Sequence, residues 1–145
     1  MFVHILKYYR FVDNLHRIRK VDDPTWDLIE TAIREMDGST QTAVTIAQSV
    51  ESEEDMLYTL TVGGGLSGQY TCSAVLGIRN EVSNLVDPSR FLDGRVTLPI
   101  GMQSFRIPAR EAVSLDKVLQ AARVYAETGE IDQSLKWEIV NPYGE

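Results

Sequence analysis

The stretch that decides the fold is VSLDKVLQAARVYAETGEIDQSLKWEIV, residues 113–140. Its first half predicts a helix, because Ser114 is a favourable N-cap and Gly129 supplies the left-handed residue that ends many helices. The apolar residues at helical spacing are Leu115, Val118, Leu119, Ala122 and Tyr125. Residues 135–139 then alternate between apolar and polar side chains, which indicates a strand. A well-capped helix therefore leads into a strand.

A second helix is predicted upstream, within DDPTWDLIETAIREMDG at residues 22–38. Asp23 is the expected N-cap, Pro24 suits the first helical position, and Gly38 marks the end. The apolar stripe comprises Trp26, Ile29, Ile33 and Met36. Such a stripe faces a core, so we expect both tryptophans, Trp26 and Trp137, to be packed.

The rest of the chain favours strands. Runs rich in β-branched and aromatic residues predict strands at residues 2–12, 40–49, 57–65, 69–78 and 95–100. Glycine-rich GGGLSG, residues 63–68, predicts a hairpin or bulge between two of these strands. The acidic segment 50–56 is interpreted as a turn, the basic residues around His16 as a loop, and DPSRFLDG, residues 87–94, as another turn. Residues 80–113 otherwise show a weak pattern, with an extended stretch at 105–113.

These elements predict an α+β fold with a mostly antiparallel sheet and two main helices packed on one face. A length of 145 residues suits one domain, residues 1–145, which needs no metal or disulfide to be stable. No apolar run reaches the roughly 18 residues of a membrane span, and the N-terminus does not resemble a signal peptide. With a single cysteine, these features predict a cytoplasmic protein.

Charge is unevenly distributed along the chain. Residues 1–20 hold five basic residues and one acidic residue, whereas residues 21–145 hold nine basic and twenty acidic ones, a net charge of −11. An acidic surface repels the phosphates of nucleic acids and membranes and attracts basic partners. We therefore expect no direct contact with nucleic acid and none with membranes.

The sequence holds few residues suited to catalysis or metal binding. GGGLSG lacks the Gly-Lys-Ser/Thr end of a phosphate loop, and a strand follows it instead of a helix. His4 and His16 have no ligand partners at metal-binding spacing, and Cys72 within a strand is expected to be a buried, inert thiol. The acidic segment lacks the calcium-loop pattern. We predict no catalytic residues, no metal, no cofactor and no enzyme activity.

The closing stretch resembles the C-terminal signature of immunity protein family one, the small intracellular inhibitors of bacterial polymorphic toxin systems. The resemblance rests on the helix start, paired alanines, an aromatic before a Thr-Gly stop, and a strand opened by Trp and an acid. The positions are Val113, Leu115, Ala121, Ala122, Tyr125, Thr128, Gly129, Trp137 and Glu138. The family commonly has Phe where this chain has Tyr125, and often a proline within the turn at 131–134.

The resemblance implies a protein that binds a cognate toxin domain, for example a nucleic-acid deaminase or nuclease, and blocks its active cleft. The acidic character of residues 21–145 agrees with a basic cleft as the target. Loop carboxylates and two interface-type side chains are the candidate contacts: Glu51, Glu53, Glu54, Asp55, Asp87, Arg90, Phe91 and Asp93. The inhibitor is expected to be a monomer or weak homodimer.

Two alternatives remain open at this point. One is a small-molecule binder or small enzyme that uses the sheet face near Gly63–Gly65 and Cys72, which would require a sizeable pocket there. The other is a homo-oligomeric structural protein in which the strand at residues 2–12 lies at a sheet edge and pairs with another chain.

Overall fold

The computed structural model describes residues 1–77 and 81–140. Within them, seven strands form one antiparallel sheet of order β2-β1-β3-β4-β5-β6-β9, and β7 and β8 form a separate hairpin. The sheet consists of β1 (Ile5–Val12), β2 (Leu15–Asp22), β3 (Ala43–Ala47), β4 (Tyr58–Leu66), β5 (Gln69–Leu76), β6 (Val82–Val86) and β9 (Lys136–Val140). The remaining elements are α1 (Trp26–Arg34), α2 (Val50–Asp55), α3 (Leu115–Thr128), β7 (Arg95–Ile100), β8 (Gln103–Pro108) and the 3₁₀ turns η2 (Pro88–Arg90) and η3 (Ala109–Glu111).

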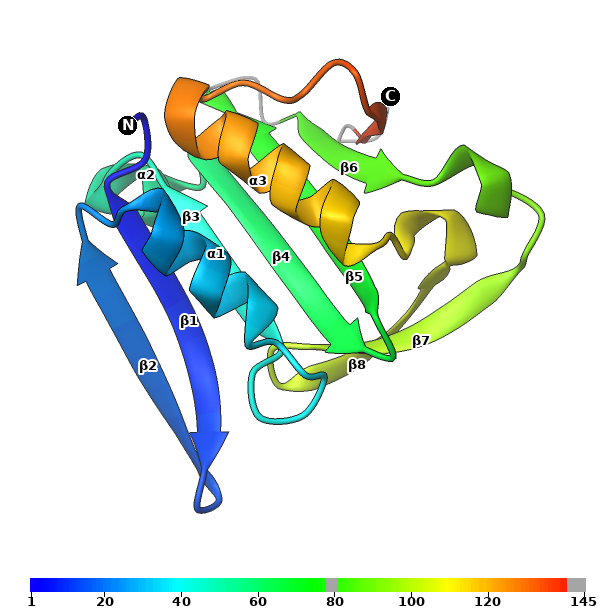
Figure 1. Ribbon diagram of the computed structural model, residues 1–145, viewed down its shortest axis with the longest axis horizontal. Coiled ribbons are helices and arrows are strands. Elements are labelled where there is room, and N and C mark those ends of the chain that lie inside the picture. Colours follow the sequence, from blue (N-terminus) through cyan, green and yellow to red (C-terminus); the bar gives the residue numbers. More distant parts are fainter. Residues whose placement is uncertain (78–80, 141–145) are drawn as a thin grey trace.

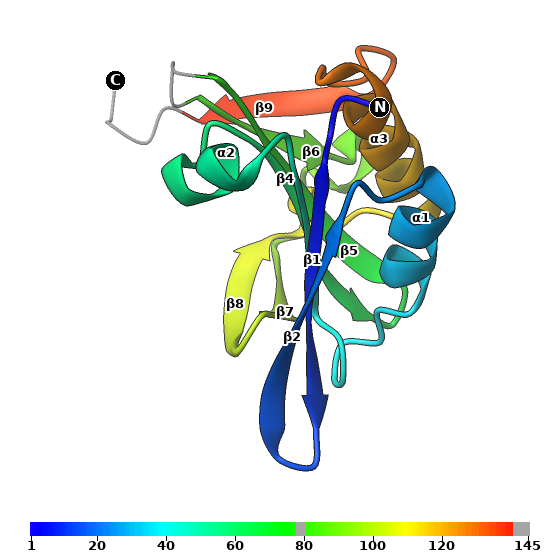
Figure 2. The same ribbon diagram turned by 90° about the vertical axis from the view of Figure 1, so that its left-hand side faces the viewer.

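The two long helices cover the same face of the sheet (Figure 1). We call this side the helix face. The short helix α2 and the β7–β8 hairpin project from the opposite side, which we call the open face (Figure 2). The predicted α+β class, with a mostly antiparallel sheet and two main helices on one face, is confirmed.

Helix α3 begins and ends where its sequence predicts. The Ser114 hydroxyl accepts a hydrogen bond from the Lys117 amide, and Gly129 has a φ of 75°. The Gly129 amide donates to the Tyr125 carbonyl, which satisfies an otherwise unpaired C=O at the helix end. A side chain at Gly129 would meet the Phe2 ring at 2.7 Å. Glycine is therefore required here by both backbone conformation and space.

The predicted start of α1 is wrong by two residues. Thr25 is the N-cap, and its side chain accepts from the Leu28 amide. Asp23 instead has a φ of 49° and bonds Nδ1 of His4 at 2.9 Å. The segment DDPT offers several capping residues in a row, and only the path of the chain out of β2 selects among them.

Three other segments differ from the prediction. Residues around His16 form strand β2, which pairs with β1 along its length. The acidic segment is the helix α2, capped by Ser49 and ended by Met56 in the left-handed conformation. Strand β6 lies in the part of the chain where the sequence pattern was weak. β2 is held by a hairpin with β1, α2 by contacts with β3 and β4, and β6 by pairing with β5 and β9.

The core lies between the helix face and the two long helices. Buried side chains from alternate strand positions, such as Val44, Leu60 and Cys72, meet residues from α1 and α3. Tyr125 is fully buried, and its hydroxyl donates to the Val75 carbonyl at 2.8 Å. Trp26 and Trp137 are only partly buried, and both pack against this core as predicted.

The triglycine lies in β4 and forms a bulge, as predicted. The register with β5 shifts between Gly64 and Leu66, and Gly64 and Gly65 have φ values of 93° and 97°. Gly63 is needed for a different reason, because a Cβ there would lie 2.7 Å from Ile100 of β7. The missing side chain lets the β7–β8 hairpin pack directly on the open face.

The strand predicted at residues 2–12 is not an edge strand. The structure places β1 between β2 and β3, with Ile5–Val12 paired to β2 and Ile5–Tyr8 also paired to β3. This corrects the basis of the homo-oligomer alternative, because β1 is an interior strand of the sheet and not its edge.

Candidate functional site

A row of polar side chains crosses the open face from one edge of the sheet to the other. Residues that pair directly across antiparallel strands project their side chains to the same face. The paired residues in this row, in strand order, are Lys20, Lys7, Thr45, Thr61, Ser73, Asn84 and Glu138. We call this set the polar row. Polar side chains on an open sheet face are suited to contact with solvent or a partner.

Adjacent pairs in the polar row are joined by hydrogen bonds. The hydroxyls of Thr45 and Thr61 lie 3.3 Å apart, and the Ser73 hydroxyl donates to the Asn84 side chain at 2.7 Å. Arg110 of η3 forms an ion pair with Glu138 at the end of the row. These contacts hold the side chains in fixed positions across several strands.

The rows on either side of the polar row are covered. Next to α2 lie Ile5, Ala47, Thr59 and Val75, whose exposed fractions are 8% or less. On the other side, the hairpin packs on Gly63, and the Thr42 hydroxyl donates to the Gly101 carbonyl at the hairpin turn. The polar row is therefore the floor of a groove between α2 and the β7–β8 hairpin.

Two cavities mark the groove at the β1 side of the sheet. The first has a volume of about 360 Å³ and is lined by Lys7, Tyr9, Thr45, Glu53, Glu54, Met56, Thr59 and Thr61. The second, of about 320 Å³, is lined by Tyr9, Phe11, His16, Ser39, Thr40, Thr42, Gly101 and Met102. Because Tyr9 borders both, they are neighbouring parts of one concave surface.

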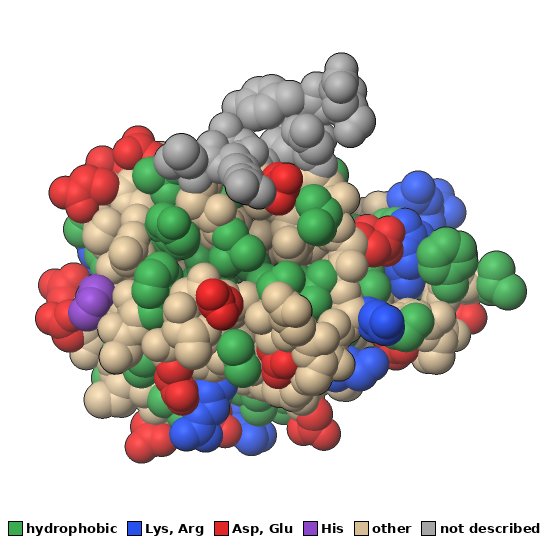
Figure 3. Space-filling view, turned by 90° about the horizontal axis from the view of Figure 1, so that it is seen from above, with side chains coloured by type: hydrophobic (Ala, Val, Ile, Leu, Met, Phe, Trp, Pro, Cys, Tyr) green, Lys and Arg blue, Asp and Glu red, His purple; other side chains and the backbone are tan. Residues whose placement is uncertain are grey.

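Helix α2 forms the acidic wall of this groove. Glu51, Glu54 and Asp55 are exposed, whereas the Glu53 side chain is only 19% exposed and bonds Nζ of Lys7 at 3.3 Å. Burial works to lower the pKa of Lys7, but the hydrogen bonds and charges of Tyr9 and Glu53 outweigh it and raise that pKa. In Figure 3, acidic side chains gather at the left-hand end of the molecule.

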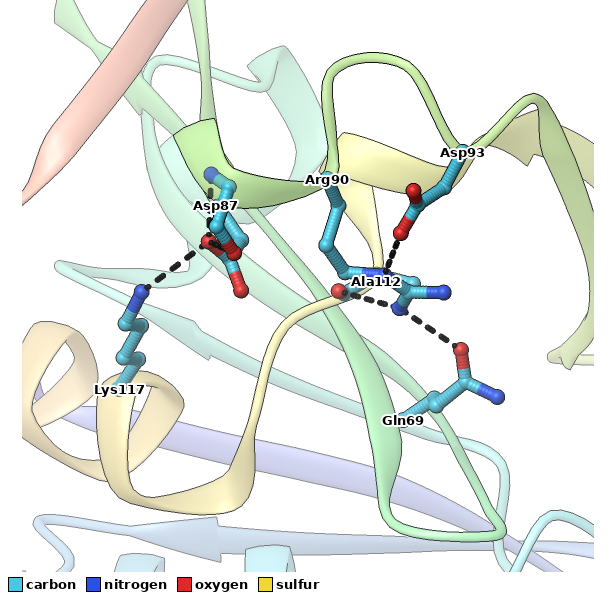
Figure 4. Close-up of polar contacts among 7 residues, drawn as sticks. Gln69, Asp87, Arg90, Asp93, Ala112 and Lys117 are labelled. Carbon is cyan, nitrogen blue, oxygen red and sulfur yellow. Dashed lines mark hydrogen bonds and ion pairs between the residues drawn. The ribbon is translucent and has the colours of Figure 1, made fainter.

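The second group of predicted contacts surrounds η2, at the opposite end of the sheet from α2 (Figure 1). Asp87 accepts from the backbone and the hydroxyl of Ser89 and lies 3.7 Å from Lys117 of α3 (Figure 4). The Ser89 hydrogen bonds and the charges of Lys117 and Arg90 lower the pKa of Asp87 against a smaller effect of burial. Asp87 therefore stabilises the loop that carries the other candidate residues.

Arg90 fixes the loop from the other side. Its guanidinium donates to the side chain of Gln69 at 3.0 Å and to the Ala112 carbonyl at 3.2 Å, and it pairs with Asp93 at 3.4 Å (Figure 4). Part of the hydrogen-bonding capacity of Arg90 is therefore taken up by contacts within the protein. A loop held this way presents its tip with little conformational freedom left to lose on binding.

The tip of this loop is apolar and exposed. Phe91 is 64% exposed and Leu92 is 93% exposed. The Arg110 guanidinium lies 5.0 Å from the centre of the Phe91 ring, and basic and apolar side chains project together from the right-hand end of Figure 3. Exposed aromatic residues with a stacked arginine are typical of interface hot spots.

The structure therefore places the eight predicted contacts in two groups, with Glu51, Glu53, Glu54 and Asp55 on α2 and Asp87, Arg90, Phe91 and Asp93 around η2. Sequence reasoning missed Lys7, Tyr9, Thr45 and Thr61 of the groove and Leu92 and Arg110 of the loop. The period-2 pattern of β3 and β4 does place Thr45 and Thr61 on the face away from the core. Their alignment with Lys7 depends on strand register, which the pattern does not give.

The region proposed for a small-molecule site is filled by side chains. Cys72 is 1% exposed on the helix face, and burial raises its pKa to about 12, so it is not a reactive thiolate at neutral pH. Ile100 and Met36 occupy the space beside Gly63 and Gly65. Across residues 1–77 and 81–140, no group of three or more metal-binding side chains comes together, and no helix is long and apolar enough to cross a membrane.

Comparison with known protein families gives a match to "Immunity protein Imm1" over residues 19–138. The chain belongs to the Imm1 family. This confirms the family suggested by the closing stretch and indicates a role in toxin immunity. No curated protein matches the chain. The matched region begins within β2, so it includes α2, the η2 loop and most of the polar row, while β1 lies before it.

Proposed function

We propose that this Imm1 protein neutralises a cognate bacterial toxin by covering the toxin's active cleft with the open face of its sheet. The acidic helix α2 is the part that meets the cleft. The target is a toxin with a basic substrate cleft, of the kind that a nucleic-acid deaminase or nuclease requires. Inhibition of this type needs no chemistry from the inhibitor.

The observation that carries the proposal is the position of α2 beside the groove. Three of its four carboxylates are exposed, and within the described residues none of these three forms an ion pair. Complementary charge raises association rates and disfavours incorrect partners. Carboxylates without internal partners lose no existing contact when a basic surface binds.

The η2 loop supplies a second contact in this proposal. Asp87, Arg90, Phe91 and Asp93 belong to it, with Leu92 at its tip. Its apolar tip would be buried against the toxin, while α2 supplies the charge. Stable protein–protein interfaces bury roughly 1,600 Å² in total, which leaves room for more than one contact region.

The test is co-purification of the tagged protein with the product of the neighbouring upstream gene, at low and at high salt. We expect a one-to-one complex that abolishes the toxicity of that product and associates more slowly at high salt. A failure to form a complex, with toxicity unchanged, would overturn the proposal.

A pair of charge-matched variants tests the role of α2. In one, Glu51, Glu54 and Asp55 are changed to Gln, Gln and Asn. In the control, the exposed Asp27, Asp116 and Glu130 are changed to Asn, Asn and Gln, which removes the same charge elsewhere. The α2 variant should associate with the toxin about tenfold more slowly at low salt, and the control should change little. Equal effects would show that net charge, and not α2, matters.

A further inference from the structure

The two walls of the first cavity in the groove carry opposite charges. Its floor is made by hydroxyl-bearing residues of β3 and β4, one wall by Lys7 and Tyr9 of β1, and the other by Glu53, Glu54 and Met56 of α2. We call this cavity the Glu53 pocket. Its volume of about 360 Å³ exceeds that of any single side chain, so one can enter from a partner.

Only one of the two carboxylate oxygens of Glu53 has a hydrogen-bond partner among the described residues. Its Oε1 bonds Lys7, but its Oε2 is shielded from solvent and has no hydrogen-bond partner among the described residues. A shielded charged acceptor without a partner is unfavourable, because it has lost its water and gained no donor in exchange. The hydroxyls of Thr45 and Thr61 bond each other and do not serve it. The free protein therefore carries a carboxylate oxygen without a donor. A donor from outside can satisfy it once rotation of the Glu53 carboxylate turns Oε2 toward the open space of the pocket.

The charge of the pocket selects a cation. Glu53 and Glu54 both line it, and Lys7 is its only basic lining residue. The Tyr9 ring can face a cation as well, since Nζ of Lys7 already lies 5.6 Å from its centre. A guanidinium or ammonium group fits these surroundings, whereas an incoming carboxylate would meet two like charges.

We propose that the Glu53 pocket receives one arginine or lysine side chain of the toxin, which donates to Oε2 of Glu53 and packs against Tyr9. This rests on the proposed function and names the chemistry of its central contact. Lys7 holds Glu53 in place in the free protein. Its positive charge opposes the incoming cation, so Lys7 tunes the affinity downward.

A merely structural role for Glu53 makes a different prediction. If the Lys7–Glu53 pair only ties α2 to the sheet, loss of either partner would have the same consequence. If Glu53 binds a toxin cation, loss of Glu53 weakens the complex while loss of Lys7 does not. The two residues thus give opposite outcomes under the proposal and equal outcomes under the structural role.

The experiment measures the affinity of the full-length protein for the toxin domain encoded by the neighbouring upstream gene. The variants are Glu53→Gln, Lys7→Met and, as a control on the same helix, Glu51→Gln. We expect Glu53→Gln to weaken binding about 30-fold or more, as for other buried charge pairs. Glu51→Gln should weaken it less than about threefold, and Lys7→Met should tighten it, because the positive charge that opposes the incoming cation is removed. Thermal melting confirms that each variant is folded.

Each other outcome has a definite meaning. If wild-type protein binds but Glu53→Gln behaves like Glu51→Gln, the pocket proposal is overturned and the immunity proposal stands. Equal weakening by Glu53→Gln and Lys7→Met also overturns it, in favour of the structural role. No wild-type complex overturns both. Alanine substitution of single toxin Arg and Lys residues, combined with Glu53→Gln in double-mutant cycles, should give one residue with strong coupling.

Discussion

The two faces of one sheet differ in what their side chains contact. On the helix face, Val44, Leu60 and Cys72 are almost fully buried against the long helices. On the open face, their chain neighbours Thr45, Thr61 and Ser73 belong to the polar row and remain partly exposed. The same strands therefore build the core with alternate residues and present a groove with the others.

This difference shows how a small protein can separate folding from binding. Side chains on opposite faces of a strand do not contact each other, so a change on the open face leaves core packing largely intact. The groove residues can then be changed without rebuilding the core. The predictions below test that separation.

The largest effect is expected for Leu60→Ala compared with its neighbour Thr61→Ala. Leu60 is 1% exposed, and truncation of a buried leucine costs about 2–5 kcal/mol. Thr61→Ala removes a partly exposed methyl group and a hydroxyl that lies 3.3 Å from that of Thr45, so it should cost less than about 1 kcal/mol. Urea unfolding followed by tryptophan fluorescence measures both. Similar losses for the two variants would show that the faces are not independent.

A smaller effect is expected for Gly63→Ala, on the open face where the hairpin packs. The new Cβ would lie 2.7 Å from Cγ2 of Ile100 and 2.8 Å from Oγ1 of Thr71. Overpacking of this kind costs about 1–3 kcal/mol. Adding Ile100→Ala removes the obstructing carbons, so the double variant should be more stable than the sum of the single losses predicts. An additive result would mean that Ile100 does not cause the strain.

The features predicted best from the sequence alone are those that depend on residues close together along the chain. Ser114 and Gly129 gave the correct ends of α3, because capping involves only a few adjacent residues. The fold class followed from the same local patterns. Helix α2 was interpreted as a turn because six residues form few internal hydrogen bonds, and its stability comes from packing on β3 and β4.

The candidate site was harder to predict for a physical reason. The polar row exists only because six strand pairings align single residues, and two of them, β1 with β3 and β6 with β9, join strands that are not consecutive along the chain. A shift of one residue in any pairing would move a different side chain into the row. The α2 carboxylates stood out as a charged cluster, whereas Lys7, Tyr9 and the threonines did not.

The helix face contains one buried polar contact whose loss should cost about 1 kcal/mol. In Tyr125→Phe, the hydroxyl that donates to the Val75 carbonyl at 2.8 Å is removed, while the ring keeps its packing. We expect a lower midpoint in urea unfolding and no change in toxin affinity, because Tyr125 is fully buried. A loss of affinity without a loss of stability would contradict the separation of the two faces.

The smallest effect concerns Asp87, a predicted contact that also stabilises its own loop. Its pKa in the folded protein is lowered, so its contribution to stability is present above the pKa of the unfolded chain, near 3.8. That contribution is lost as the pH falls through the lower folded pKa. Asn at this position keeps the acceptor for Ser89 and removes the charge that meets Lys117.

Asp87→Asn should therefore cost a few tenths of a kcal/mol at pH 7, as expected for a partly exposed ion pair at 3.7 Å. The difference between the variant and the wild type should shrink as the pH falls below 3.8 and through the lower folded pKa, because Asp87 then becomes protonated as well. Urea unfolding at pH 7, 5 and 3 measures this difference. If stability is equal at every pH but toxin affinity falls, the charge of Asp87 serves binding and not the loop. Asp87 would then belong with Glu51, Glu54 and Asp55 of α2, which form no ion pair with the described residues and can meet a partner.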